Sequence, residues 1–186
     1  MKSFTFYYFL VSVLLIAGCT EKDKAPSRFD FTGQRDASLI RGFNYTPANV
    51  VAPRHHLDCW VKYDSATIEF DMDLAKGLNL NQVRVFVPYQ AYTEDSAALP
   101  TKLRHFVRTC HARNIGVMPV LQGGPWVRDT SLRYQARNWA RFLVDAISDE
   151  PGLAMWDVMN EPDYPPAPEE RVMRNFENCK FMTKTF

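Results

Sequence analysis

Short apolar runs alternate with amphipathic stretches along most of the chain, and this alternation is the feature that most restricts the fold. Strands are predicted at Ile40 to Tyr45, Val83 to Val87, Ile115 to Leu121 and Leu153 to Met159. Apolar residues recur at helical spacing between and after them, at Ser65 to Leu78, Thr101 to Asn114 and Ser131 to Ser148. Apolar strands separated by helices form a parallel sheet that helices cover, with right-handed crossovers.

The spacing of the predicted strands helps to choose between two α/β architectures. Strand starts recur at roughly 30 to 40 residues, as in a (β/α)8 barrel, whose eight units need about 250 residues. A doubly wound open sheet is the competing fold. No strand is followed by Gly-x-Gly-x-x-Gly, and Gly123-Gly124 leads into Pro125-Trp126, which disfavours a dinucleotide site. We therefore expect an α/β fold, a parallel (β/α)8 TIM barrel, with only about the first four βα units in these 186 residues.

The N-terminus is predicted to be a targeting segment. Lys2 precedes the apolar run from Phe4 to Ile16, which ends in Ala17-Gly18-Cys19. This resembles a bacterial lipoprotein signal, in which cleavage leaves the cysteine as a lipidated N-terminus; an ordinary export signal with an incidental cysteine is the alternative. We expect a signal peptide at 1–18, a tether at 19–38 and the barrel domain at 39–186. By the same resemblance, Thr20 favours a lipid anchor in the outer membrane or on the surface of the bacterial cell envelope.

The charge and the cysteines of the chain limit which kinds of partner and cofactor are expected. The net charge is +1 and the basic residues are scattered, so nucleic acid is not expected, and no protein partner can be inferred. No Cys-x-x-Cys or His-x-x-x-His occurs, so we expect no metal and no cofactor. Beyond Cys19 the chain has Cys59, Cys110 and Cys179, and this odd number leaves at least one thiol free or paired outside the chain.

Polar and aromatic residues follow each predicted strand, at the end where barrel enzymes hold their active site. They are Asn44, Tyr45, Tyr89, Gln90, Gln122, Trp126, Asn160 and Glu161. Each alone could be a loop residue or a helix cap, but their coincidence on one rim indicates a site. Trp126 could offer its face to a sugar ring or pack on its own loop. The adjacent His55 and His56 are expected on the surface, with one of them facing a cleft as the alternative.

Arg84 is a charge inside a short apolar strand. An arginine in such a place is unlikely to be buried without an anionic partner. We expect its guanidinium to lie at the barrel mouth near Glu161.

The triplet Asn160-Glu161-Pro162 stands at the end of an apolar strand that bears Trp156. Together with "QVRVFV" around Arg84 and the opening "GFNYTP", it resembles the retaining glycoside hydrolases of the large (β/α)8 clan. These include the cellulase and β-mannanase-like family 5 and the barrel domains of family 2, the β-galactosidase-like enzymes. The resemblance covers roughly Ile40 to Pro162.

This resemblance implies a role for each matching residue. Glu161 would be the general acid/base, Asn160 would bind the sugar 2-hydroxyl, and Arg84 would support the catalytic carboxylates. The rim positions and the resemblance together make five residues candidate contacts of a carbohydrate substrate, namely Asn44, Tyr45, Tyr89, Trp126 and Trp156.

Retaining hydrolysis also needs a second carboxylate, about 5 to 5.5 Å from the first. Asp157 would lie deeper than Glu161 by about 13 Å along the strand, so it cannot be that group. Asp163 falls in a proline-rich loop, and the resemblance places the nucleophile after a seventh strand. We therefore expect a glycoside hydrolase of β-linked poly- or oligosaccharide in full-length form, and a nearly inactive fragment here. A non-catalytic, glycan-binding surface lipoprotein or a defunct remnant is the alternative.

Overall fold

The computed structural model describes residues 39–127, 129–161, 169, 172–173 and 177–180. The expected signal peptide and tether, with Cys19, lie outside the described residues, as does Asp163. Their assignments stay predictions. In the part of the chain that is described, no helix is both long enough and apolar enough to cross a membrane.

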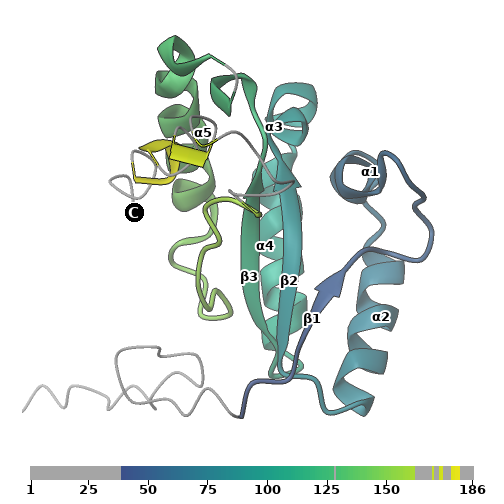
Figure 1. The fold of residues 1–186 in the computed structure, drawn as a ribbon. Helices are drawn as coiled ribbons and strands as arrows, with labels where there is room; N and C mark the ends of the chain where they lie inside the picture. The colour runs from purple at the N-terminus through teal and green to yellow at the C-terminus, as the bar shows by residue number, and fades with distance from the viewer. Residues whose placement is uncertain (1–38, 128, 162–168, 170–171, 174–176, 181–186) are drawn as a thin grey trace, which may run out of the picture.

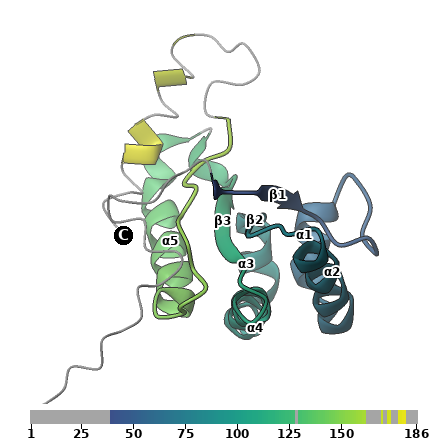
Figure 2. The ribbon, with the colours of Figure 1, turned by 90° about the horizontal axis from the view of Figure 1, so that it is seen from below.

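Three parallel strands form the sheet, in the order β1-β2-β3. They are β1 (Gly42–Tyr45), β2 (Gln82–Pro88) and β3 (Gly116–Gln122). The helices that follow them in turn are α2 (Ser65–Gly77), α4 (Leu99–His111) and α5 (Arg133–Ile147). Figure 2 shows these three helices in a row on one side of the strands. The predicted alternation of parallel strands and covering helices is confirmed.

The helices α2 and α4, which precede β2 and β3, end in the same way. Asn79 after α2 and Asn114 after α4 have left-handed φ angles of 58° and 61°. In each case a backbone N–H beyond the helix bonds back to its last turn, from Leu80 to the Ala75 carbonyl and from Ile115 to the Cys110 carbonyl, both at 3.0 Å. Asparagine tolerates this conformation, so the chain turns sharply into the next strand.

Side chains alternate across the sheet and so define two faces. Val83, Val85 and Val87 of β2 are fully buried and face the helices. The apolar stripes predicted for the helices supply the other side of this core, because all of the following are buried: Ile68, Met72, Ala75, Leu103, Phe106, Val107, Cys110, Trp139, Leu143, Ala146 and Ile147. The opposite face of β2 carries Gln82, Arg84 and Phe86, and in a barrel this face is the interior.

The fourth predicted strand is not regular. Residues 153–157 run parallel to β3 but pair with it only at two isolated bridges, Val117 with Leu153 and Val120 with Asp157. Three steps along β3 therefore match four along the segment, so the segment holds one extra residue, as in a β-bulge. The expectation of a continuous strand to Met159 is wrong.

Two short helices lie beyond the carboxyl ends of the strands, where loops were expected. They are α1 (His55–Val61), which follows β1, and α3 (Tyr89–Asp95), which begins directly after β2. Figure 1 shows both at the upper ends of the strands. His55 and His56 therefore lie on a helix and not on an extended segment.

Candidate active site at the carboxyl ends of the strands

Arg84 is the centre of the polar network on the inner face. Its Nε and Nη2 donate to Oδ2 of Asp157 at 3.0 and 2.6 Å. Nη2 also donates to Oδ1 of Asn160 at 2.8 Å, and Nη1 donates to Oδ1 of Asn44 at 3.2 Å. One guanidinium thus joins β1, β2 and the segment after α5. Because Arg84 holds the carbonyl oxygen of Asn160, the amide nitrogen of Asn160 is left to donate to another partner.

The ion pair supplies the anionic partner that Arg84 needs, but the partner is Asp157. The side chains of Arg84 and Asp157 are 21% and 23% exposed, so both are largely withdrawn from water. Among the described residues, the Arg84 side chain hydrogen-bonds to Asp157, Asn160 and Asn44, and Glu161 is not one of its hydrogen-bond partners. The guanidinium therefore reaches the residue beside Glu161 and not Glu161 itself.

Asp157 is fully engaged by its surroundings. Its Oδ2 accepts from Arg84, and its Oδ1 accepts from the backbone N–H of Met159 at 3.2 Å. Its backbone also bonds twice to β3: its N–H donates to the Pro119 carbonyl at 2.9 Å, and its carbonyl accepts from the Leu121 N–H at 2.8 Å. The Asp157 carboxylate held in this way anchors the segment to β2.

Glu161 ends the described part of this segment. Its side chain is exposed, and its φ angle of 44° lies in the left-handed region that residues with a Cβ rarely adopt. Such a conformation costs about 1 to 3 kcal/mol and occurs preferentially at functional sites. The residue predicted to be the general acid/base thus stands in a strained conformation beside the Arg84 network.

His56 is a member of the mouth that the sequence did not favour. Its Nδ1 lies 3.1 Å from Oε1 of Gln122, which ends β3, and its ring stacks on Phe86 with centroids 4.1 Å apart and planes within 6°. The Arg84 guanidinium carbon lies 4.8 Å from the same Phe86 ring. Burial lowers the pKa of His56, as do His55 and Arg84, while the bond to Gln122 opposes this shift. This lowered pKa favours the neutral form of the imidazole.

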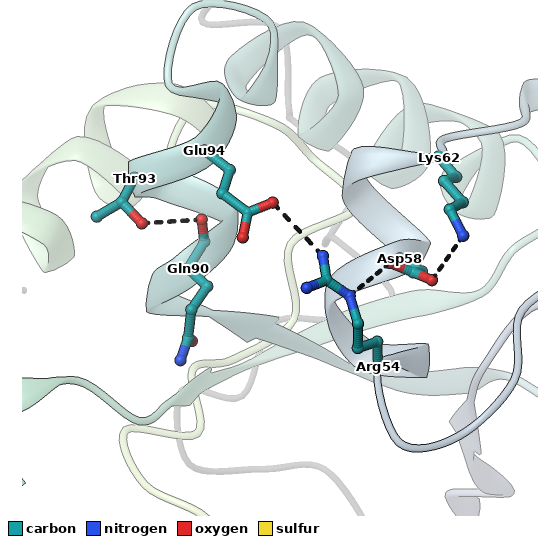
Figure 3. A network of polar contacts seen from close by, with 6 residues as sticks. All are labelled: Arg54, Asp58, Lys62, Gln90, Thr93 and Glu94. Atoms are coloured by element: carbon teal, nitrogen blue, oxygen red, sulfur yellow. Dashed lines mark hydrogen bonds and ion pairs between the residues drawn. The ribbon is translucent and has the colours of Figure 1, made fainter.

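Contacts with β2 and with α3 fix the position of α1 at the mouth. Trp60 is buried and donates from Nε1 to the Phe86 carbonyl at 2.6 Å. Figure 3 shows how ions join α1 to α3: Arg54 lies 3.4 Å from Asp58 and 3.6 Å from Glu94, while Lys62 lies 2.9 Å from Asp58. The hydrogen bond from Lys62 is the main reason that the pKa of Asp58 lies below its ordinary value, with Arg54 acting in the same direction.

Three of the predicted sugar contacts lie elsewhere. Tyr45 is buried, packs on Phe106 and donates its hydroxyl to Asp71 at 2.8 Å, so it faces the helices. Burial raises the pKa of Tyr45, and Asp71 adds to the shift. Strand alternation explains this placement, since Asn44 faces inward and its neighbour must face outward. The sequence itself carried that signal.

Trp126 and Tyr89 belong to an aromatic cluster under the helices. Trp126 is 1% exposed, with its ring 5.5 Å from Trp139 and 4.9 Å from Tyr89. Tyr89 is half-buried and donates its hydroxyl to Oε1 of Gln135 at 3.3 Å. The structure therefore favours the alternative for Trp126, in which its ring packs against neighbouring residues and not against a sugar. Trp156 is half-buried against the core, and Asn44 remains exposed at the Arg84 network.

The inner face below the network is hollow. A cavity of about 340 Å³ opens there, lined by Ile40, Gly42, Phe43, Asn44, Gln82, Arg84, Met118 and Met155. Apolar atoms dominate its lining. Within the described residues, no three His, Cys, Asp or Glu side chains gather as metal ligands. Cys59, Cys110 and Cys179 are free thiols.

Comparison with known proteins shows that the fold is similar to part of an α/β barrel. No protein-family model and no curated protein matches the chain. Solved structures do match, among them a GH5_18 protein of Streptomyces cattleya in complex with GlcNAc, at 21% identity and a TM-score of 0.58, covering 77% of this chain and 42% of that one. A GH5_18 protein of Bifidobacterium longum subsp. infantis matches at 17% identity and a TM-score of 0.59, covering 75% and 40%.

An exo-β-1,4-mannosidase of Opitutaceae bacterium strain TAV5 matches at 25% identity and a TM-score of 0.63, covering 82% of this chain and 31% of that one. The chain thus spans less than half the length of these proteins. Its fold resembles part of the (β/α)8 barrel of these family 5 proteins, and the resemblance noted from its sequence is confirmed at that level.

Proposed function

We propose that the mouth holds the sugar-binding and acid/base half of a retaining glycoside hydrolase for β-linked oligo- or polysaccharides. The observation that carries this proposal is the bond from Arg84 to Asn160, directly beside a strained and exposed Glu161. In this proposal Glu161 protonates the leaving oxygen, the Asn160 amide donates to the sugar 2-hydroxyl, and Arg84 fixes that amide.

The substrate class follows from the neighbours by analogy. One is an exo-β-1,4-mannosidase, and another, a Streptomyces cattleya GH5_18 variant, is in complex with Manβ1-4GlcNAc. A β-mannoside is therefore the first substrate to test.

Hydrolysis is proposed for a full-length form of about eight βα units. Retaining cleavage needs a nucleophile about 5 to 5.5 Å from the acid, and Asp157 is occupied by Arg84 and the Met159 N–H. For the 186-residue chain alone we expect sugar binding and no more than trace hydrolysis. The same engagement of Asp157 favours the second candidate function, a non-catalytic glycan-binding protein.

Glu161→Gln in a full-length form tests the proposal. Gln keeps the size of the side chain but cannot donate a proton to the leaving group, so turnover of an aryl β-mannoside should fall by at least about 100-fold while binding persists. Glu69→Gln is the matched control, because Glu69 lies on α2 near His105, at 3.3 Å, in the outer layer. Unchanged turnover in Glu161→Gln would rule out Glu161 as the general acid, whereas an unmodified full-length form that binds the glycoside without turnover would favour the glycan-binding function.

We also propose that Cys19 carries lipid and anchors the protein in the bacterial cell envelope. The support is the apolar run that ends in Ala17-Gly18-Cys19. Cys19→Ser should move the protein from the membrane fraction to the soluble fraction. Unaltered membrane association of that variant would contradict the assignment.

A further inference from the structure

His56 and Gln122 form a side-chain pair at the mouth to which the proposed function gives no role. They come from α1 and from the last residue of β3, 66 positions apart, and meet at 3.1 Å. The contact joins Nδ1 of the ring to the amide oxygen of Gln122. An oxygen can only accept, so Nδ1 carries the proton of the neutral ring and Nε2 carries the lone pair.

The ring is held firmly on the inner side of β2. It stacks on Phe86, which alternates with Val85 and Val87 and therefore points away from the helices. The Trp60 bond to the Phe86 carbonyl fixes α1 over the same residue. A side chain fixed before a ligand arrives loses little conformational entropy on binding, which suits a recognition group.

The surroundings of the ring keep Nε2 a hydrogen-bond acceptor. Burial, the neighbouring His55 on α1 and Arg84 on β2 all disfavour a second proton on His56, and Gln122 on β3 is uncharged. Across the same inner face, the Asn160 amide is a donor because Arg84 occupies its oxygen. A sugar hydroxyl both donates and accepts, so an acceptor and a donor at one mouth are complementary to it.

We propose that His56 is a specificity-determining residue of this site, which accepts a hydrogen bond from a sugar hydroxyl through Nε2 while Gln122 holds Nδ1–H. The inference rests on the proposed function, since it assigns a further contact to the same carbohydrate. Gln122 is the positioning residue, which selects the tautomer. His56 thus adds a second sugar contact to that of the Asn160 amide, whereas Tyr45 and Trp126 are buried.

The first test needs no variant. In ¹⁵N-labelled full chain at neutral pH, the imidazole spectrum of His56 should show a proton on Nδ1 and an unprotonated Nε2. Addition of β-1,4-mannobiose should shift the Nε2 resonance in the direction of a hydrogen-bonded acceptor. A proton on Nε2 in the free chain would overturn the inference whatever the chain binds.

The second test measures affinity for the same disaccharide. His56→Ala should weaken mannobiose binding about fivefold, the equivalent of about 1 kcal/mol, which is one neutral hydrogen bond. His105→Ala is the matched control: His105 is also half-buried and bonded through Nδ1, to the Tyr63 hydroxyl at 2.7 Å, but it lies on α4. Its affinity should be unchanged.

The outcomes separate this inference from the proposed function. Mannobiose binding that His56→Ala leaves unchanged would overturn the role of His56 and leave the proposed function standing. An unmodified, folded chain that binds no mannobiose would overturn both. Circular dichroism of each variant shows that a loss of affinity is not a loss of fold.

Discussion

The ion pair between Arg84 and Asp157 allows a quantitative prediction about stability. Arg84→Met keeps much of the length of the side chain but removes the guanidinium. Asp157 then keeps its negative charge in a place where it is only 23% exposed, and the oxygens of Asn160 and Asn44 also lose their donor. Breaking a buried pair typically costs about 3 to 5 kcal/mol. Because both partners retain about a fifth of their exposure, we expect the lower part of that range or slightly less, about 2 to 3 kcal/mol.

Urea unfolding followed by circular dichroism measures this difference. With a slope of about 2 kcal/mol per molar urea, the midpoint should fall by about 1 to 1.5 M. Adding Asp157→Asn to Arg84→Met should restore part of the loss, since the uncompensated charge is then gone. The comparison isolates the charge from the packing of the arginine stem.

Arg113→Met is the matched control for this experiment. Arg113 bonds to both oxygens of Asp73 at 2.8 and 2.9 Å, so the geometry of the pair is at least as good. The Asp73 side chain is 62% exposed, however, and water replaces its lost partner. We expect a loss below about 1 kcal/mol. Equal losses for Arg84→Met and Arg113→Met would refute the argument that burial decides the size of the effect.

Other features of the structure give shorter predictions. Gly152→Ala should lower the free energy of unfolding by about 1 to 3 kcal/mol, because the new Cβ would meet backbone and side-chain atoms of α4 at 2.8 Å. The Cβ added by Gly77→Ala meets nothing within 4 Å, so this substitution should raise the free energy of unfolding by up to about 1 kcal/mol. Urea unfolding measures both changes. Cys59, whose pKa burial raises to about 12, and Cys110, whose pKa burial also raises, should react with a thiol reagent only after unfolding, as peptide mass spectrometry would show. His56 has a lowered pKa in the folded chain, so the unfolded chain binds the proton more readily; stability should fall as the pH drops below about 6.5, and His56→Phe should reduce that fall.

The regular part of the fold was predictable because burial imposes a period on the sequence. In α4, Leu103, Phe106, Val107 and Cys110 lie on one stripe and are all buried, as predicted. The β-branched residues of β2 likewise mark a strand that is covered by helices. In these elements the local pattern and the tertiary burial agree, so the pattern is sufficient.

The site was less predictable because it depends on contacts between distant segments. The helix α1 has seven residues and no side-chain cap, so its sequence gives little helical signal. Its place is set by Trp60 and by Arg54, which bind to β2 and α3. His56 therefore faces the mouth for tertiary reasons. Tyr45 is different, because strand alternation next to Asn44 already excluded it from the inner face.

The irregularity of the segment after α5 is what assembles the site. In a regular strand, Asp157 and Asn160 are three residues apart and point to opposite faces, yet both side chains bond to the one guanidinium of Arg84. The chain achieves this because Oδ1 of Asp157 accepts from the Met159 N–H two residues ahead, which is the local turn that aspartate favours.

Asp157 thus bends the backbone with one oxygen and holds Arg84 with the other. The bend brings Asn160 to the inner face and leads into the left-handed φ of Glu161. In a continuous fourth strand, the side chains of Asp157 and Asn160 would point to opposite faces and could not both bond to Arg84. The carboxylate that cannot be the nucleophile is therefore the residue that places the acid/base candidate beside its neighbours, and the departure from ideal strand geometry belongs to the mechanism that we propose.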